Sequence, residues 1–401
     1  MITLADIRQA RDRIAPHVIR TPLVPSPTLS SMSGYEVYLK LETMQKAGSF
    51  KVRGAMNRIL SRRGEIGEKG VVAASAGNHA QGVAVAARVA GIPATVVMPV
   101  WAPVSKQAAA RSYGARVILS GGTLEESMVH AGELAGSGMT IIPAFDDWEV
   151  IAGQGTIGLE ILEDLPGTDL ILVPVGGGGL IGGIAVAAKG LDPRVGIRGV
   201  QAAACPSAAE AVRAGRPVLV PAGPTLADGI RVRQAGDLTF PLLRDLVEEI
   251  LLVEEEEIAM AMLLLLERKK VIAEGAGAAP LAALLSGKVR ARAGSRVVLV
   301  VSGGNVDTPL LDRVIRHGLV RSGRVLQAEV ILDDLPGSLA RLLSVIAGAG
   351  GNILHIHHAR GGRELPVRSV RVALEIETRD EGHGREIAGA VEGAGYRLVV
   401  S

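Results

Sequence analysis

The feature that most constrains this chain is an alternation, between residues 70 and 325, of short apolar runs with longer alanine-rich segments of helical period. The apolar runs are hydrophobic throughout and do not alternate with polar residues, which is typical of parallel strands that helices cover on both faces. They lie at residues 71–74, 95–100, 116–119, 170–175, 196–200 and 297–301. The pattern predicts an α/β fold with open parallel sheets.

The pattern changes after residue 321, which predicts a second and smaller domain. The expected elements, in chain order, are a strand at 324–333, a helix at 338–347, strands at 352–359 and 369–376, a helix at 386–392 and a strand at 396–400. The order β-α-β-β-α-β is that of a ferredoxin-like α+β module. We therefore expect one domain over residues 1–321 and a second over residues 322–401.

Composition and charge exclude several classes of protein. Hydrophobic residues make up 48% of the 401 residues, which is enough for a globular core and argues against disorder. The 43 Lys and Arg residues nearly balance the 41 Asp and Glu residues, and no basic block stands out, so no nucleic-acid partner is expected. The single cysteine, Cys205, cannot form an intramolecular disulfide, and the chain opens without a signal-peptide pattern. A reducing, cytoplasmic setting is expected.

An uncharged stretch at residues 170–188 is long enough to cross a bilayer, but four consecutive glycines would break a spanning helix. The stretch is predicted to form a strand, a turn and a helix instead, and no membrane partner is expected. In such a turn the backbone N–H groups converge on an anion at the start of the helix, so a phosphate is the expected ligand. The residues of this turn are Gly176, Gly177, Gly178, Gly179 and Leu180. The alternative is a tight helix–sheet crossing that binds nothing.

Gly177, Gly179 and Gly182 also match the G-x-G-x-x-G fingerprint of dinucleotide-binding proteins. That fingerprint needs an acidic residue at the end of the next strand, where it binds the ribose. The next strand here ends in Gln201, which three alanines follow. A simple phosphate site is therefore favoured over a dinucleotide site.

Polar residues also follow two other predicted strands. The run Ser75, Ala76, Gly77, Asn78, His79 comes directly after one strand and opens a helix, a place where an N-cap and an anion-binding site can coincide. A plain N-cap is the alternative, and His79 taken singly is expected to be structural. The run 302–305, which begins with Ser302, ends another strand at the carboxyl edge, where open α/β sheets bind ligands.

Lys51 lies in the first turn of a further predicted helix, within the run Ser-Phe-Lys-Val-Arg-Gly-Ala at residues 49–55. A cation at this position opposes the helix dipole, so the placement is unusual for a surface lysine. It is explained if Lys51 has a covalent or an electrostatic partner. The alternative is an ordinary surface lysine, one of 43 basic residues.

These four clusters, in this order, resemble the motifs of the fold-type II pyridoxal-phosphate enzymes, and within them most closely those of the threonine dehydratases (threonine ammonia-lyases). Residues 225–229 and 274–278 resemble further family segments, so the likeness covers residues 5–320. The module at 322–401 resembles an ACT domain, a small amino-acid-sensing unit. The resemblance implies a two-lobed catalytic domain with its smaller lobe at residues 45–145, pyridoxal 5'-phosphate as cofactor, and a homo-oligomer (dimer or tetramer).

The resemblance also implies roles for single residues. Lys51 would bind the cofactor covalently and act as general base, and its first-turn position beside Arg53 would lower its pKa as this chemistry requires. The residues implied around the cofactor are Phe50 on the ring, Asn78 at the ring hydroxyl, Ser302 at the pyridine nitrogen, Gly176 to Gly179 with Leu180 at the phosphate, and Glu274 as a further candidate. The residues implied for the substrate carboxylate are Ser75, Gly77, Asn78 and His79.

The implied reaction is the deamination of L-threonine to 2-oxobutanoate and ammonia, as in isoleucine biosynthesis, with L-serine giving pyruvate. Two alternatives stay open: a serine-specific or β-replacement enzyme on the same scaffold, and a catalytically silent amino-acid sensor. Racemisation is not expected, because Ala76 stands where serine racemases carry a second serine. No catalytic metal is expected either, since Gln201, Cys205 and Ser207 offer no acidic ligand. An amino-acid effector would bind the ACT-like module at residues 334–339 and 348–352.

Overall fold

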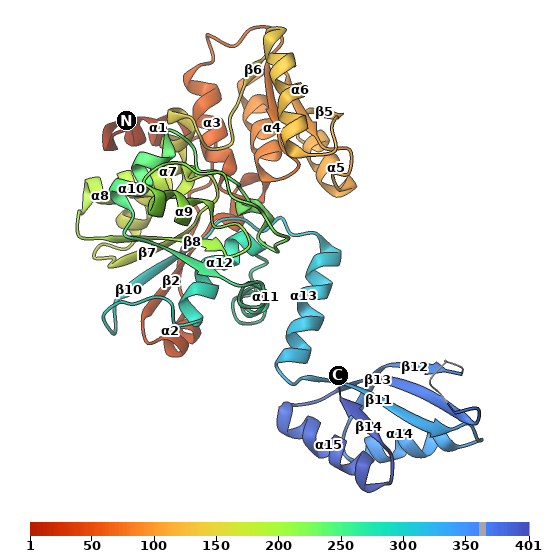
Figure 1. Cartoon of the computed structure of the whole chain (residues 1–401). Helices are drawn as coiled ribbons and strands as arrows, with labels where there is room; N and C mark the ends of the chain where they lie inside the picture. Colours follow the sequence, from red (N-terminus) through yellow and green to blue (C-terminus); the bar gives the residue numbers. More distant parts are fainter. Residues whose placement is uncertain (361–365, 401) are drawn as a thin grey trace. The chain divides into compact units, whose positions relative to one another are not determined.

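A computed structural model of the chain describes residues 1–360 and 366–400 (Figure 1). Two compact units, Met1–Asp307 and Thr308–Ser401, each hold their own contacts. This division comes earlier than the one predicted after residue 321, because helix α13 (Thr308–Arg321) contacts strand β11 (Val325–Asp333) of the second unit.

The larger sheet of the first unit has six strands, in the order β1-β2-β10-β7-β8-β9. Their bounds are β1 Leu23–Pro25, β2 Glu36–Leu41, β7 Leu170–Pro174, β8 Gly196–Ala202, β9 Glu249–Val253 and β10 Arg296–Val301. The prediction of purely parallel sheets is wrong at one edge, because β1 pairs antiparallel with β2. Only residues 26–35 separate these two strands, fewer than the dozen or so that a parallel crossover needs. The first unit therefore has one mixed sheet and one parallel sheet.

The smaller sheet of the first unit is parallel throughout, in the order β5-β4-β3-β6. Its strands are β3 Val71–Ala74, β4 Ala94–Met98, β5 Arg116–Leu119 and β6 Thr140–Ile141, and helices α4 (Asn78–Ala90), α5 (Val104–Ser112) and α6 (Leu124–Gly136) alternate with them. The predicted α/β alternation is confirmed in both sheets.

Glycines let the helices of this unit approach one another closely. Helices α7 (Trp148–Asp164) and α8 (Gly179–Leu191) meet where a Cβ at Gly183 would overlap the carbonyl of Ile151. Helix α3 (Lys51–Ser61) meets α7 where Gly54 and Gly153 lie back to back. The remaining helices are α1 Leu4–Ile14, α2 Pro27–Ser33, α9 Ser207–Ala214, α10 Thr239–Leu246, α11 Glu255–Leu264 and α12 Gly275–Leu285. Close packing thus accounts for part of the glycine content.

The uncharged stretch at residues 170–188 forms strand β7, a glycine turn and helix α8, as predicted. Its strand is buried in the core of the first unit. Among residues 1–360 and 366–400, no helix is both long and apolar enough to span a membrane.

The second unit has a four-stranded antiparallel sheet in the order β12-β13-β11-β14. Its elements after β11 are α14 Ser338–Gly348, β12 Asn352–Ala359, β13 Ser369–Glu377, α15 Glu381–Gly393 and β14 Leu398–Val400. Alternate residues of the central strands, such as Val330 and Val372, pack on Leu342 of α14 and Ile387 of α15. This strand order is that of the ferredoxin-like arrangement, so the predicted β-α-β-β-α-β order is confirmed.

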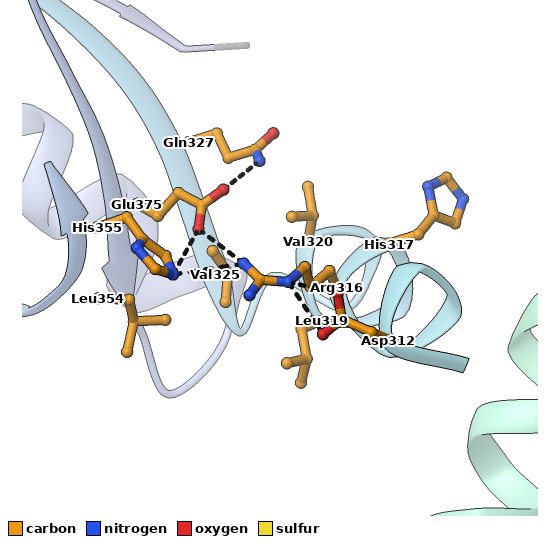
Figure 2. A pocket seen from close by; sticks show the side chains of 10 residues that line it. All are labelled: Asp312, Arg316, His317, Leu319, Val320, Val325, Gln327, Leu354, His355 and Glu375. Carbon is orange, nitrogen blue, oxygen red and sulfur yellow. Dashed lines mark hydrogen bonds and ion pairs between the residues drawn. The ribbon is translucent and has the colours of Figure 1, made fainter. Parts of the chain in front are cut away.

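Helix α13 joins this unit through a charged contact beside a pocket with a volume of about 460 Å³ (Figure 2). Arg316 of α13 lies 3.7 Å from Glu375 of β13 and 3.2 Å from Asp312, one helical turn earlier. Leu319 and Val320 line the same pocket on the helix side. These contacts explain why α13 belongs to the second unit.

Candidate active site

Lys51 is the first residue of α3, and its side chain turns back into the first unit. Its Nζ donates a hydrogen bond to the carbonyl of Ala144 at 3.0 Å and lies 5.1 Å from the centroid of the Phe50 ring. Burial lowers the pKa of Lys51 to about 8, although the nearby carboxylate of Glu274 acts in the opposite direction. A lysine with such a pKa keeps a usable fraction of neutral, nucleophilic amine near neutral pH.

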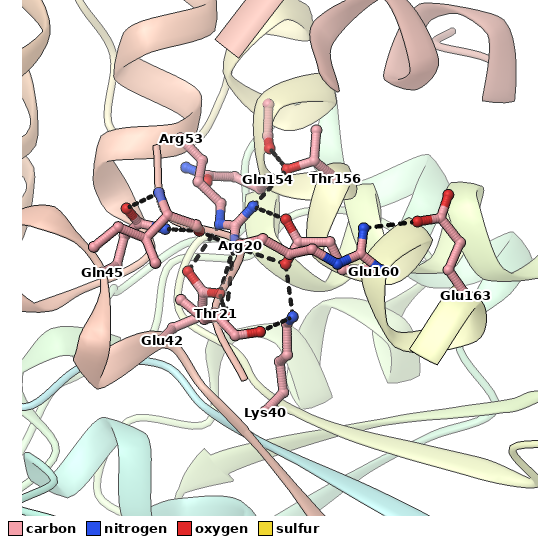
Figure 3. A network of polar contacts seen from close by, with 12 residues as sticks. Arg20, Thr21, Lys40, Glu42, Gln45, Arg53, Gln154, Thr156, Glu160 and Glu163 are labelled. Atoms are coloured by element: carbon pink, nitrogen blue, oxygen red, sulfur yellow. Dashed lines mark hydrogen bonds and ion pairs between the residues drawn. The ribbon is translucent and has the colours of Figure 1, made fainter. Parts of the chain in front are cut away.

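Arg53 is not the cause of this lowered pKa, which corrects the expectation from the sequence. Its guanidinium is fully buried and lies 2.8 Å from Glu42 and 2.6 Å from Glu160 (Figure 3). Lys40 joins the same group through Glu160 at 2.6 Å. Because two carboxylates balance the two cations, Arg53 adds little net charge near Lys51. The group instead ties the start of α3 to α7.

The glycine turn begins α8 without a side-chain cap. Gly178 is the N-cap residue with a φ of 96°, a conformation that favours glycine, and its position leaves the first N–H groups of α8 without capping side chains. Thr239 donates a hydrogen bond to the carbonyl of Gly177 at 2.6 Å, which holds the turn. An uncapped helix start of this kind binds anions.

Lys51 and the glycine turn meet at neighbouring residues. The carbonyl that Lys51 contacts belongs to Ala144, and the next residue, Phe145, lies against Gly177 and Gly179 so closely that a Cβ on either would overlap it. The alternative of tight packing at the turn therefore also holds in part, because neither Gly177 nor Gly179 has room for a side chain. The backbone at residues 144–145 brings the amine and the anion-binding turn together.

The second predicted cluster forms the start of α4. Gly77 is the N-cap residue, has open space around it, and donates its N–H to Ser75 Oγ at 3.2 Å. His79 is buried and its Nε2 lies 2.8 Å from the carbonyl of Ile142. Burial and the charge of Lys51 lower the pKa of His79 to about 4, so this imidazole is neutral and bound to the backbone. Ser75 and Gly77 leave room for an anion beside this helix start.

Asn78 and Glu274 connect two clusters that lie far apart in the sequence. Asn78 Nδ2 donates to the two carboxylate oxygens of Glu274 at 2.8 and 2.9 Å. Burial and the charge of Asp228 raise the pKa of Glu274 to about 7, against the opposing effect of the hydrogen bond from Asn78. A carboxyl group with this pKa exchanges a proton near neutral pH.

The end of strand β10 completes the arrangement. Ser302 is buried, and its carbonyl accepts a hydrogen bond from the N–H of Phe50 at 3.1 Å. Gly303 accepts one from the N–H of Glu274 at 3.0 Å. The loop after β10 therefore lies between the lysine helix and Glu274.

Two groups that contribute to the site were not predicted from the sequence. Asn305 donates to Asn78 Oδ1 at 2.8 Å, and its place in the run 302–305 was the available signal. The carbonyl of Ala144 has no sequence signal, because every residue carries a backbone carbonyl. Within residues 1–360 and 366–400, no group of three or more His, Cys, Asp or Glu could hold a metal ion.

The arrangement suits a cofactor that carries an electrophilic carbonyl carbon and a phosphate. The amine of Lys51 can attack the carbon, and the uncapped start of α8 can bind the phosphate. The Phe50 ring lies beside the Lys51 amine, the backbone of Ser302 accepts the N–H of Phe50, and Asn78 offers a side-chain donor, so the described residues fit such a group.

Comparison with known proteins gives concordant results. Residues 14–303 match the family model described as "Pyridoxal-phosphate dependent enzyme". The chain is 49% identical over 399 residues to an L-threonine ammonia-lyase of Thermotoga maritima, which covers 99% of each chain, and 48% identical over 401 residues to that of Geobacter sulfurreducens, which covers 100% of each. Among solved structures, a threonine deaminase from T.th. matches with a TM-score of 0.71 and 44% identity, over 76% of this chain and 99% of that one. Maize serine racemase matches with a TM-score of 0.75 and 39% identity, over 80% of this chain and 98% of that one.

Proposed function

This chain belongs to the family of pyridoxal-phosphate dependent enzymes, and from that premise we propose that it deaminates L-threonine to 2-oxobutanoate and ammonia, and L-serine to pyruvate and ammonia. The relatives named L-threonine ammonia-lyase, which align over almost the whole chain, support this substrate. The observation that carries the proposal is the lysine amine of lowered pKa beside an uncapped, glycine-lined helix start.

Pyridoxal phosphate supplies the electron sink that makes removal of the Cα proton of an amino acid feasible. Lys51 would hold the cofactor through its amine, and Gly176 to Gly179 with Leu180 would hold the phosphate through backbone N–H groups. Phe50 would pack on the ring, Asn78 would donate to its phenolic oxygen, and Ser302 would face its nitrogen. An aspartate at this position would force that nitrogen to be protonated, whereas a serine hydroxyl does not. The serine therefore favours elimination over transamination.

The removal of the Cα proton falls to Lys51. Its pKa of about 8 would allow the Lys51 amine to take that proton as general base near neutral pH. Ser75, Gly77, Asn78 and His79 would bind the substrate carboxylate at the start of α4, where the helix dipole favours an anion. His79 is neutral and bonded to the carbonyl of Ile142, so it serves as a fixed part of this site and not as the base.

The proposal is tested by the absorbance of bound cofactor and by turnover of threonine, serine and O-acetylserine measured side by side. We expect visible absorbance and release of oxo acid from threonine and serine. The Lys51→Ala variant should lose both, whereas Lys46→Ala, an exposed lysine before the same helix, should keep both. Retention of absorbance and turnover by Lys51→Ala would contradict the mechanism.

For the second unit, we propose an ACT domain at residues 322–401, preceded by helix α13, that regulates a cytoplasmic homo-oligomer whose catalytic residues lie in the first unit. Its support is the ferredoxin-like strand order and the left-handed Gly337 (φ 87°) that begins α14 beside the expected effector loops. Threonine turnover should respond to a free amino acid bound at residues 334–339 and 348–352. No change in turnover or in thermal stability with any of the common amino acids would contradict this regulatory role.

A further inference from the structure

Asn305 lies where three of the motif segments meet. Its Nδ2 donates two hydrogen bonds, to the carbonyl of Ala47 at 2.7 Å and to Asn78 Oδ1 at 2.8 Å. A backbone carbonyl can only accept, so the amide atom of Asn305 that faces Ala47 must be its nitrogen. The same nitrogen faces Asn78, so the atom of Asn78 on that side must be its oxygen. The direction of both side-chain amides is therefore set by one backbone carbonyl.

As a consequence, the Nδ2 donor group of Asn78 points away from Asn305. With Oδ1 bound to Asn305, Nδ2 is directed to Glu274, at 2.8 and 2.9 Å from the two carboxylate oxygens. A free asparagine amide could turn over and present either a donor or an acceptor. Here only the donor can face the site.

The backbone that Asn305 contacts is itself in an unfavourable conformation. Ala47 has a φ of 62°, which is uncommon for a residue with a side chain, and Gly48 follows with a φ of 69°. A Cβ at Gly48 would overlap the side chain of Asn305. This turn directly precedes Ser49 and Phe50 at the start of the lysine helix. Asn305 thus fixes both the approach to Lys51 and the amide of Asn78.

We propose that Asn305 is a positioning residue that fixes Asn78 as a hydrogen-bond donor to the phenolic oxygen of the cofactor, and thereby keeps that oxygen ionised. The proposal rests on the proposed function, because it needs pyridoxal phosphate at Lys51, whose phenolic oxygen would replace one of the Glu274 oxygens as an acceptor from Asn78 Nδ2. A donor facing this oxygen stabilises its anionic form, whereas an acceptor would favour its protonated form.

The test is Asn305→Asp, read by absorbance. A carboxylate cannot donate to Ala47 or to Asn78, so Asn78 would turn its nitrogen toward the new carboxylate and its oxygen toward the cofactor and Glu274, which would lose its hydrogen bonds from Asn78. Bound cofactor absorbs in the visible when its phenolic oxygen is ionised and in the near ultraviolet when it is protonated. We expect the ratio of the two bands to shift toward the ultraviolet by about tenfold, which corresponds to about 1.4 kcal/mol.

Two further variants keep the experiment decisive. Asn305→Ser removes both hydrogen bonds without adding a charge, and should shift the bands in the same direction by a smaller factor. Asn57→Asp is the control for a new carboxylate elsewhere in the first unit, because Asn57 is also buried and its Nδ2 donates to the carbonyl of Glu149 at 2.7 Å, although its Oδ1, unlike that of Asn305, accepts a hydrogen bond from Arg13. It should leave the band ratio of the wild-type protein unchanged.

The outcomes separate this inference from the proposed function. A wild-type protein without any cofactor band would overturn both. A wild-type band with an unchanged ratio in Asn305→Asp and Asn305→Ser would overturn the role of Asn305 and leave the proposed function standing. An equal shift in Asn57→Asp would also overturn it, because the effect would then follow from buried charge in general.

Discussion

At the scale of residues, Lys51 and Glu274 are the two groups whose surroundings change their acid–base behaviour most usefully. Burial lowers the pKa of Lys51 to about 8 and raises that of Glu274 to about 7, so each group is moved toward its neutral form. Each also opposes the effect of burial on the other, since their charges have opposite signs. The two groups therefore titrate within the range where proton transfer is easiest.

This pair predicts a pH profile for cofactor attachment. Only the neutral amine reacts, so the rate at which cofactor-free protein binds added pyridoxal phosphate should rise about tenfold per pH unit below the pKa of Lys51 and level off above about pH 8. In Glu274→Gln the carboxylate that raises this pKa is gone, and the bend should move to lower pH. Stopped-flow absorbance measures both profiles. A bend that stays in place or moves to higher pH would contradict the assigned role of Glu274.

At the scale of elements, the buried ions between α3 and α7 decide how the lysine helix is held. Arg53, Lys40, Glu42 and Glu160 are all almost fully buried, and each cation has a carboxylate partner (Figure 3). A buried ion that loses its partner is costly, because the remaining charge stays without water. The contact between α3 and α7 therefore needs all four buried ions, even if the ion pairs themselves add little to the free energy of unfolding.

The matched pair Glu160→Gln and Glu163→Gln tests this. Both lie on α7, but Glu163 is partly exposed and pairs with Arg11 and Arg20 at the surface. We expect Glu160→Gln to lower the free energy of unfolding by about 3 to 5 kcal/mol, and Glu163→Gln to lower it by roughly 0 to 1 kcal/mol. Urea unfolding followed by circular dichroism gives both values. Similar losses in the two variants would show that this group does not anchor α3.

The elements that the sequence predicted are those with a strong local signal. Long buried strands such as β7 and β10, and the glycine turn before α8, follow from continuous apolar runs and from backbone geometry. Four strands of the first unit were missed: β1 and β6 are only 3 and 2 residues long, too short to show a period, and β2 and β9 each begin with a glutamate and were not recognised as apolar runs. They exist because neighbouring strands offer them hydrogen bonds.

The site residues also divide into those with a local sequence signal and those that are placed by contacts between distant segments. Lys51, Asn78 and Ser302 stand out by their motifs and the strands before them. The partner of Lys51 could not be predicted, because it is the backbone of Ala144, 93 residues away. Nor could the neutralisation of Arg53 by Glu42 and Glu160, since nothing in the sequence places α7 against α3. Contacts between distant segments are decided by packing.

At the scale of the whole molecule, the chemistry and the proposed regulation belong to different units. Every residue assigned to the cofactor or the substrate lies within Met1–Asp307, and the antiparallel sheet lies within Thr308–Ser401. Each unit has its own buried core, which is the usual condition for folding alone.

We therefore expect a chain that ends at Asp307 to fold, to show the cofactor absorbance and to release oxo acid from threonine at a rate on the order of that of the full chain. Any response of turnover to a free amino acid should be lost. Turnover and absorbance of the shortened and the full chain, measured side by side, check this. An inactive but folded shortened chain would mean that the second unit contributes to the site.

The glycine contacts between helices have one more consequence. Gly82 lies against the backbone of Lys51, Gly153 against Gly54, and Gly183 against Gly155, so that backbone meets backbone from the lysine helix through α7 to α8, which starts at the glycine turn. None of these helices can slide past its neighbour without overlap. The helix that carries the amine and the helix that begins at the glycine turn are therefore held at a fixed spacing. We expect an analogue whose phosphate arm is one carbon longer to bind less tightly than the cofactor itself.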